Sequence, residues 1–341
     1  MLNCIGLEIA TTGEQAKSAV QSIYFGGGTP SLLSSSELSN LLVSIHKNFE
    51  VNPNAEITLE ANPDDISDSK ANDWIKLGIN RLSIGVQSFH SKDLISMNRS
   101  HDSEQAFAAI QTVKNAGFTN YSVDLMFALP LLTNDNWREN LKQAVSLKIP
   151  HLSCYNLTIE EQSALIKMIE KGKQIPLSES KSTRQFEILM ETLAQNGYEQ
   201  YEISNFCLPS QESKHNSAYW EQKAYYGIGP SAHSYVNGNR YHNIAHNVQY
   251  MNGIEQKISV QQQEELSPEN KFNEYIMTRL RCKTGADMEY LKRNFSQLYG
   301  SIEPAIASES AKGNLILGEK AIRLSTKGKF IADQVAMELF V

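Results

Sequence analysis

The sequence predicts an α/β fold built on parallel strands. Strand and helix signals alternate strictly from residue 21 to residue 203, and this alternation requires helical crossovers between parallel strands. A glycine-rich turn follows the first of these strands, and several later strands end in a polar residue. Six strand candidates are too few for a closed eight-stranded barrel. A doubly wound sheet and a partial barrel both remain open from the alternation alone.

The elements of this region can be placed from apolar periodicity and from capping residues. An amino-terminal helix has its last turns between Cys4 and Thr11, and a strand over 21–25 runs into the glycines. Leucines at helical spacing up to Ile45 predict the next helix, and Gly117 is typical of the residue that follows a helix. The other expected strands are 55–60, 80–87, 119–126, 151–157 and 198–203, separated by a short helix through Trp74 and by helices over 103–117, 134–147 and 179–195.

Polar side chains are predicted on one face of three neighbouring strands. Successive residues of a strand point to opposite faces, so Glu60, Gln87 and Asp124 alternate with apolar residues that face covering helices. Each stands at or near a carboxyl-terminal strand end, where α/β folds bind ligands. Any one of them alone is more often solvated or a cap. Three on one face, beside a glycine-rich loop, favour a ligand cavity.

The alternation stops after the last of these strands. Residues 204–250 are expected to be irregular, and 252–267 to form a polar surface connection. From Pro268 the apolar spacing is helical, and 315–326 predicts a hairpin followed by a last helix. This order indicates a mainly α, winged-helix-like region without a clear basic face. The predicted domains are 1–205, 206–267 and 268–341.

Composition excludes several classes of protein. The net charge of −7 argues against nucleic-acid binding. The longest apolar run, Val123–Leu132, is too short to span a membrane, and the amino terminus lacks a secretory signal pattern. The four cysteines are far apart in the sequence and form no disulfide framework or CxxC pair. These features favour a reducing, cytoplasmic setting.

Histidines offer two further candidates. His242 and His246 are spaced so that one helix face could present both to a metal, but they lack a glutamate partner. His215 is read, on residue types alone, as an exposed loop histidine. The aromatic pair Tyr219–Trp220 close to it suits either an inter-domain contact or a flat ligand.

Several strings are similar to known families. Residues 24–33, 56–63, 80–89 and 123–130 resemble the radical S-adenosylmethionine (SAM) proteins related to oxygen-independent coproporphyrinogen III oxidase. Residues 151–160, 215–220 (HNSAYW) and 226–234 resemble, more narrowly, the HemW branch of haem chaperones. The likeness runs from about residue 20 to the carboxyl terminus.

The resemblance implies a fold and a set of binding residues. The fold would be a partial (β/α)6 radical SAM barrel that lacks its first strand, with a carboxyl-terminal accessory domain. Arg99 would pair with the carboxylate of SAM, and His215 would be a ligand of haem iron. The full set of SAM-binding residues that the resemblance implies is Gly26, Gly27, Gly28, Thr29, Glu60, Gln87, Arg99 and Asp124.

One family motif is missing from the sequence. The family carries CxxxCxxC before the glycine-rich strand, and those thiolates hold a [4Fe–4S] cluster. Here Met1 stands shortly before that strand, and Cys4 is alone. We therefore expect this sequence not to assemble the cluster. The short amino terminus is interpreted as a truncation, through a misplaced start or an incomplete gene.

The resemblance favours a haem-binding protein over an enzyme. The main hypothesis is a cytoplasmic chaperone that delivers haem to haem proteins of the respiratory chain, with at most a peripheral association with the membrane. The alternative is oxidative decarboxylation of coproporphyrinogen III, and a third hypothesis is a remnant without function. HNSAYW at 215–220 discriminates, because it resembles the chaperone branch and not the oxidase.

Overall fold

The computed structural model describes residues 1–158 and 178–341. The chain divides into two compact units. The sheet unit consists of Tyr24–Ser35 and Glu56–Glu212, and the terminal unit of Met1–Ile23, Ser36–Ala55 and Ser213–Val341. The division into three domains stays a prediction, and the end of the string 151–160 lies outside the described residues.

A seven-stranded sheet has the order β1-β2-β3-β4-β5-β7-β6. Strands β2 to β5 pair in parallel, which confirms the predicted α/β class. The strands are β1 (Val20–Phe25), β2 (Val51–Ala61), β3 (Arg81–Gln87), β4 (Tyr121–Phe127), β5 (His151–Asn156), β6 (Glu199–Gln200) and β7 (Asn205–Cys207).

The prediction of a last parallel strand over 198–203 is wrong. The chain turns back after β6, and β7 pairs antiparallel with both β5 and β6. Glu202 closes this turn, because its Oε1 accepts a hydrogen bond from the Ser204 amide at 3.1 Å and another from the Asn205 side chain. A local carboxylate–amide contact thus ends the strand that the sequence predicted to be longer.

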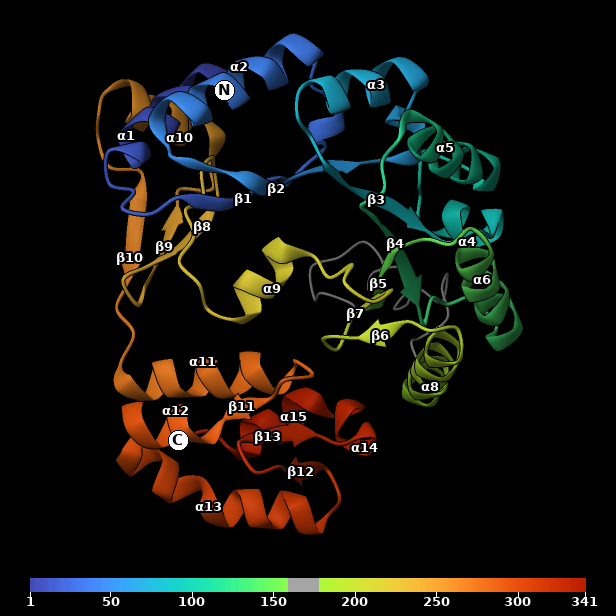
Figure 1. Cartoon of the computed structure of the whole chain (residues 1–341), viewed down its shortest axis with the longest axis vertical. Helices are drawn as coiled ribbons and strands as arrows, with labels where there is room; N and C mark the ends of the chain where they lie inside the picture. The colour runs from blue at the N-terminus through green and yellow to red at the C-terminus, as the bar shows by residue number, and fades with distance from the viewer. Residues whose placement is uncertain (159–177) are drawn as a thin grey trace, which may run out of the picture. The chain divides into compact units, whose positions relative to one another are not determined.

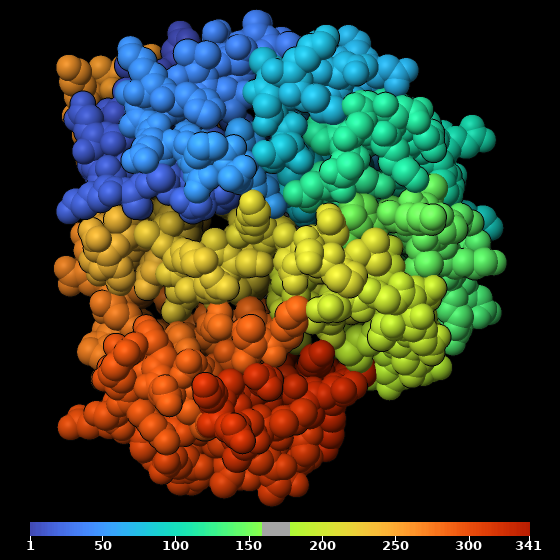
Figure 2. Space-filling model, viewed as in Figure 1, coloured from blue at the N-terminus to red at the C-terminus, as the bar shows by residue number. Residues whose placement is uncertain are grey.

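Helices α3 (Asp68–Lys76), α5 (Ser103–Ala116), α6 (Asn134–Ser146) and α8 (Glu179–Gln195) lie on the same side of strands β3 to β5 (Figure 1). Trp74 of α3 and Trp137 of α6 are buried, and the indole Nε1 of Trp137 donates to the Gln185 carbonyl of α8 at 2.9 Å. Helices α3 and α5 pack together, and their side chains form a continuous surface (Figure 2). Gly117 follows α5 with φ 104°, as the sequence predicted.

The terminal unit begins with the predicted amino-terminal helix, α1 (Leu2–Gly13), and includes α2 (Ser35–Asn48) for most of its length. Helix α1 packs on α10 (Asn247–Glu255). Cys4, Tyr250 and Val260 form a buried cluster between these segments. None of the four cysteines takes part in a disulfide bond.

Residues 204–250 are more regular than expected. Ser213 caps helix α9 (Lys214–Trp220), because its side chain accepts from the Asn216 amide. A hairpin of β8 (His233–Val236) and β9 (Asn239–Asn243) turns over Asn237 and Gly238, both of which have positive φ, 53° and 73°. Such a turn favours Asn-Gly, so the sequence contained a hairpin signal that the irregular reading missed.

The two histidines whose spacing would place them on one helix face do not share such a face. His242 lies in β9, whereas His246 is the N-cap residue of α10, so one helix face does not present both. Among residues 1–158 and 178–341, no group of three or more His, Cys, Asp or Glu side chains is arranged to hold a metal ion. The expected connection 252–267 contains the end of α10 and β10 (Gln261–Glu264), which pairs with β9.

The carboxyl-terminal region consists of helices followed by a hairpin and two short helices. The predicted hairpin is confirmed, because β12 and β13 pair antiparallel on either side of Gly318. No helix in the described part of the chain has the length and apolar character needed to cross a membrane. The elements are α11 (Pro268–Leu280), β11 (Ala286–Asp287), α12 (Met288–Asn294), α13 (Ser296–Ala311), β12 (Leu315–Leu317), β13 (Ala321–Leu324), α14 (Thr326–Lys329) and α15 (Ala332–Glu338).

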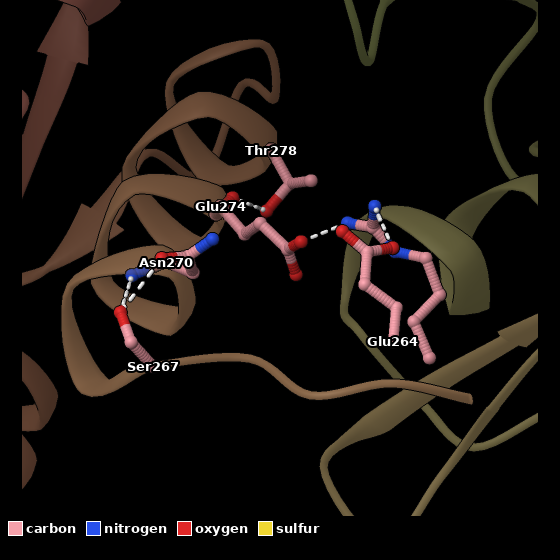
Figure 3. Close-up of polar contacts among 6 residues, drawn as sticks. Glu264, Ser267, Asn270, Glu274 and Thr278 are labelled. Carbon is pink, nitrogen blue, oxygen red and sulfur yellow. Dashed lines mark hydrogen bonds and ion pairs between the residues drawn. The ribbon is translucent and has the colours of Figure 1, made fainter.

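Helix α11 is fixed at its start and along its first turns (Figure 3). The Ser267 hydroxyl accepts from the Asn270 amide at 3.1 Å, which caps the helix. Arg240 of β9 pairs with Glu274 of α11, and with Glu264 of β10 at 3.1 Å. One guanidinium therefore ties the three-stranded sheet of β8, β9 and β10 to the first helix of the carboxyl-terminal region.

Candidate functional site

Glycine is required at two kinds of position in the loop after β1. Gly27 and Gly28 have φ 76° and 94°, where residues with a Cβ are strained, although no atom lies within 4 Å of a Cβ built there. At Gly26 the reason is space, because a Cβ would lie 2.6 Å from the Tyr24 ring and 2.8 Å from Glu60 Oε1. The loop therefore exposes its backbone at the carboxyl end of β1.

Glu60 of β2 holds this loop. Its Oε1 accepts a hydrogen bond from the Tyr24 hydroxyl at 2.8 Å, and its Oε2 accepts from the Gly27 amide at 3.1 Å. Burial and the adjacent Glu60 charge raise the pKa of Tyr24 above its usual range, so the phenol stays a donor. The carboxylate thus fixes the strand and the turn that follows it.

The structure brings most of the predicted SAM-binding residues into one pocket in the sheet unit. Glu60 of β2 pairs with Ser83 of β3, and Ser83 pairs with Ser122 of β4. Asp124 is two residues after Ser122, so its side chain shares the face of Glu60, as strand alternation predicted. Gly26 and Gly27 border Glu60 instead of lining the pocket. The pocket is lined by Gly28, Thr29, Glu60, Gln87, Arg99 and Asp124 from the prediction, together with Pro30, Ser31, Ala61, Asn62, Ser83 and Gly85.

Arg99 reaches the pocket from the loop after helix α4 (Ser91–Ser96). Its NH2 group donates to Asn62 Oδ1 at 2.8 Å and to the Gly85 carbonyl at 3.0 Å. Its Nε is buried and has no hydrogen-bond partner among the described residues. A guanidinium that is oriented in this way, with a donor still unused, suits an anionic group such as a carboxylate.

Asp124 is the other incompletely satisfied group of the pocket. The residue is half-buried, but its Oδ1 is covered and has no hydrogen-bond partner in the described part of the chain. Burial raises the pKa of this carboxyl to about 7; the Ser153 hydroxyl lowers the pKa and the Glu60 charge raises it. Asp124 can therefore donate a proton in a hydrogen bond, or accept one, near neutral pH.

The raised pKa of Asp124 predicts a pH-dependent stability. The folded carboxyl keeps its proton between the ordinary value of 3.8 and about 7, whereas the unfolded one loses it, so the free energy of unfolding falls as the pH rises through this window. We expect the free energy of unfolding to fall by on the order of 2 kcal/mol across this window. Solvent in the pocket screens the charge and keeps the effect below what the full pKa difference would give. Urea unfolding at several pH values should show a smaller decline for Asp124→Asn. Equal slopes for the parent and the variant would contradict the assignment.

His215 lies in the terminal unit, near the start of helix α9, and is not an irregular loop residue. It is half-buried, and its Nδ1 is 2.9 Å from the Ser22 hydroxyl on β1. Tyr219 stands one helical turn further on the same face and is 50% exposed. Its ring contacts those of Trp220 and Tyr225 at centroid distances of 5.6 and 5.5 Å. An imidazole and an exposed aromatic ring thus share one helix face.

Sequence reasoning missed three residues that shape these sites: Ser22, Tyr24 and Asn62. Asn62 is two residues after Glu60 and therefore shares its face, so strand alternation alone could have found it. Ser22 and Tyr24 share a face of β1 for the same reason, but nothing in their local sequence indicates their partners.

An open sheet of parallel strands, with a glycine-rich first loop and polar strand ends around one pocket, is an arrangement that radical SAM proteins share. The sequence profile of the Radical SAM superfamily matches residues 7–144. The structure of the radical SAM enzyme coproporphyrinogen III oxidase (HemN) from Escherichia coli superposes with a TM-score of 0.86 at 23% identity, covering 100% of this chain and 82% of that one.

The sequence is more similar to haem chaperones. It is 37% identical over 287 residues to the haem chaperone HemW of Lactococcus lactis, covering 82% of this chain and 75% of that relative. It is 32% identical over 342 residues to the haem chaperone HemW of Bacillus subtilis, covering 98% and 89%. The chain belongs to the HemW family.

Membership in the Radical SAM superfamily implies SAM and a [4Fe–4S] cluster. The pocket fits SAM, because Arg99 Nε and Asp124 Oδ1 are buried polar atoms that a ligand with charged and hydroxyl groups would satisfy. The cysteines do not fit the cluster. Cys4 is buried in α1, with its sulfur directed at the Met251 carbonyl and Glu255. The described residues hold no cluster-binding set.

Proposed function

We propose that this protein is a haem chaperone, that His215 is the ligand through which it binds haem iron, and that its recipients are haem proteins of the respiratory chain. We place it in the cytoplasm, a setting favoured by its four cysteines, none of which forms a disulfide bond. The observation that carries the proposal is the placement of His215 and Tyr219 on one face of α9, within a family whose named relatives are haem chaperones.

The side chains of α9 suit a porphyrin. A neutral imidazole is a common axial ligand of haem iron, and the exposed Tyr219 ring offers a flat face beside it. Tyr219 is itself braced by the Tyr225 ring, and Trp220 lies beneath the Arg281 guanidinium at 5.5 Å. These contacts restrict the aromatic side chains before a ligand arrives, which lowers the entropic cost of binding.

We propose that the sheet-unit pocket binds SAM. Arg99 would bind its carboxylate, Glu60 would accept hydrogen bonds from its ammonium or ribose hydroxyls, and the Gly28 and Thr29 backbone would lie against its methionine part. Asp124 Oδ1 would donate a hydrogen bond to a polar group of the ligand when protonated, or accept one when ionised. When bound with a cluster, SAM supplies radical chemistry; the residues described here supply binding and orientation.

Haem titration followed by absorption spectroscopy tests the proposed function. The parent protein is expected to form a histidine-coordinated haem spectrum with saturable binding. His215→Ala should lose that spectrum and bind haem about a hundredfold more weakly, because only contacts with the porphyrin remain.

His246→Ala is the matched control, because this histidine caps an exposed helix start and should leave the spectrum unchanged. An unchanged spectrum in His215→Ala would remove His215 as the ligand. Turnover of coproporphyrinogen III by the protein would favour the oxidase hypothesis instead.

A further inference from the structure

We infer that Ser22 is a positioning residue for the iron ligand, and that its hydroxyl accepts a hydrogen bond from Nδ1–H of His215. This inference rests on the proposed haem-binding function. It is carried by the Ser22 Oγ to His215 Nδ1 distance of 2.9 Å, a contact between residues 193 positions apart in the sequence. Both residues belong to the terminal unit.

The choice of nitrogen follows from the tautomers of imidazole. A neutral ring carries one proton, so one nitrogen donates a hydrogen bond and the other offers its electron pair. If Nδ1 keeps the proton and donates it to Ser22, Nε2 is the nitrogen whose electron pair can bind iron. If Ser22 donated to Nδ1 instead, Nε2 would carry the proton and could not ligate. A serine hydroxyl permits the first arrangement, which is the one that metal-binding histidines use.

Helix α9, which carries His215, depends on contacts with other segments. Helix α9 has only seven residues, too few to be stable without tertiary contacts. It is fixed by its Ser213 cap and by Lys214, whose Nζ donates to the Asn54 carbonyl at 3.1 Å. These two contacts fix the backbone at the start of the helix. Ser22 lies on β1, where the Val20 amide donates a hydrogen bond to the Glu50 carbonyl at 2.7 Å and holds the strand backbone. From this fixed strand, the Ser22 hydroxyl can set the rotation of the His215 imidazole.

The experiment uses the full chain loaded with haem and reduced to the ferrous state. The Fe–His stretching frequency in the resonance Raman spectrum depends on the hydrogen bond at Nδ1, so a purely structural role of Ser22 would not move it. Ser22→Ala should lower this frequency and weaken haem affinity about tenfold, the scale typical of groups that orient a metal ligand.

Two near-isosteric variants separate the hydroxyl from packing. Ser22→Thr keeps the hydroxyl and should retain the parental frequency and affinity, whereas Ser22→Val has the same shape without it and should behave as Ser22→Ala. A parental frequency in both Ser22→Ala and Ser22→Val, with the Fe–His band lost in His215→Ala, would overturn the role of Ser22 and leave the haem-binding proposal standing. An Fe–His band that persists in His215→Ala would overturn both.

Discussion

Replacing Glu60 with alanine is expected to weaken the binding of SAM to the sheet-unit pocket by orders of magnitude. Glu60 accepts hydrogen bonds from the Tyr24 hydroxyl and the Gly27 amide, and we propose that it also accepts from the cofactor. Alanine therefore releases the glycine-rich turn and removes the acceptor at once. Hydrogen bonds to a charged group contribute about 1.5–3 kcal/mol each, so the loss of two costs about 3–6 kcal/mol and predicts an affinity about 10² to 10⁴ times weaker.

Equilibrium dialysis with SAM measures this effect. Glu60→Gln keeps the shape and one acceptor oxygen, and should bind with intermediate affinity. Glu50→Ala is the matched control, because Glu50 is an exposed residue immediately before the same strand and should bind as the parent does. Saturable binding to Glu60→Ala within about threefold of the parent affinity would exclude Glu60 from the site.

The pocket could be predicted from the sequence because strand alternation is a local property. Glu60 and Asp124 project from parallel strands that pair in register with β3, so knowing which residues alternate was enough to place them together. Gln87 joined them for a different reason. It has φ 68°, and the β3–β4 register shifts between Ile84 and Gln87. Alternation does not predict such an irregularity.

Other features depend on contacts between distant residues and left no local pattern. Ser22 meets His215, and Glu8 meets residues more than two hundred positions away. Local polar contacts also override periodicity, as Glu202 does where it ends the predicted strand 198–203. The hairpin over Asn237 and Gly238 belongs to a different class, because its signal was present in the sequence.

Glu8 makes several hydrogen bonds of this long-range kind. It is a carboxylate on α1 that is only 8% exposed. Its Oε2 accepts from the Tyr250 hydroxyl at 2.5 Å and from the Gly229 amide at 2.8 Å, while Oε1 accepts from Asn243 Nδ2 at 2.6 Å. The carboxylate thus joins α1, α10 and the loop before β8, in which Gly229 has φ 108°.

Glu8→Ala is expected to destabilise the terminal unit by about 3–5 kcal/mol. A buried donor that loses its acceptor costs about 1–3 kcal/mol, and here the Tyr250 hydroxyl and the Gly229 amide lose theirs. Asn243 keeps one bond to the Gly229 carbonyl at 2.9 Å, which limits the total. The free energy of unfolding from urea titration measures the loss.

Two further variants, one at the end of the same helix and one at Glu8 itself, separate the effect of the hydrogen bonds from that of helix propensity. Glu14→Ala alters the exposed residue that ends α1, and its effect should stay within about 0.5 kcal/mol. Glu8→Gln keeps the volume but turns an amide toward one of the donors, so its cost should fall between the two. If Glu8→Ala were no more destabilising than Glu14→Ala, the hydrogen bonds of Glu8 would contribute nothing net, and the packing of Cys4, Tyr250 and Val260 alone would hold α1 in place.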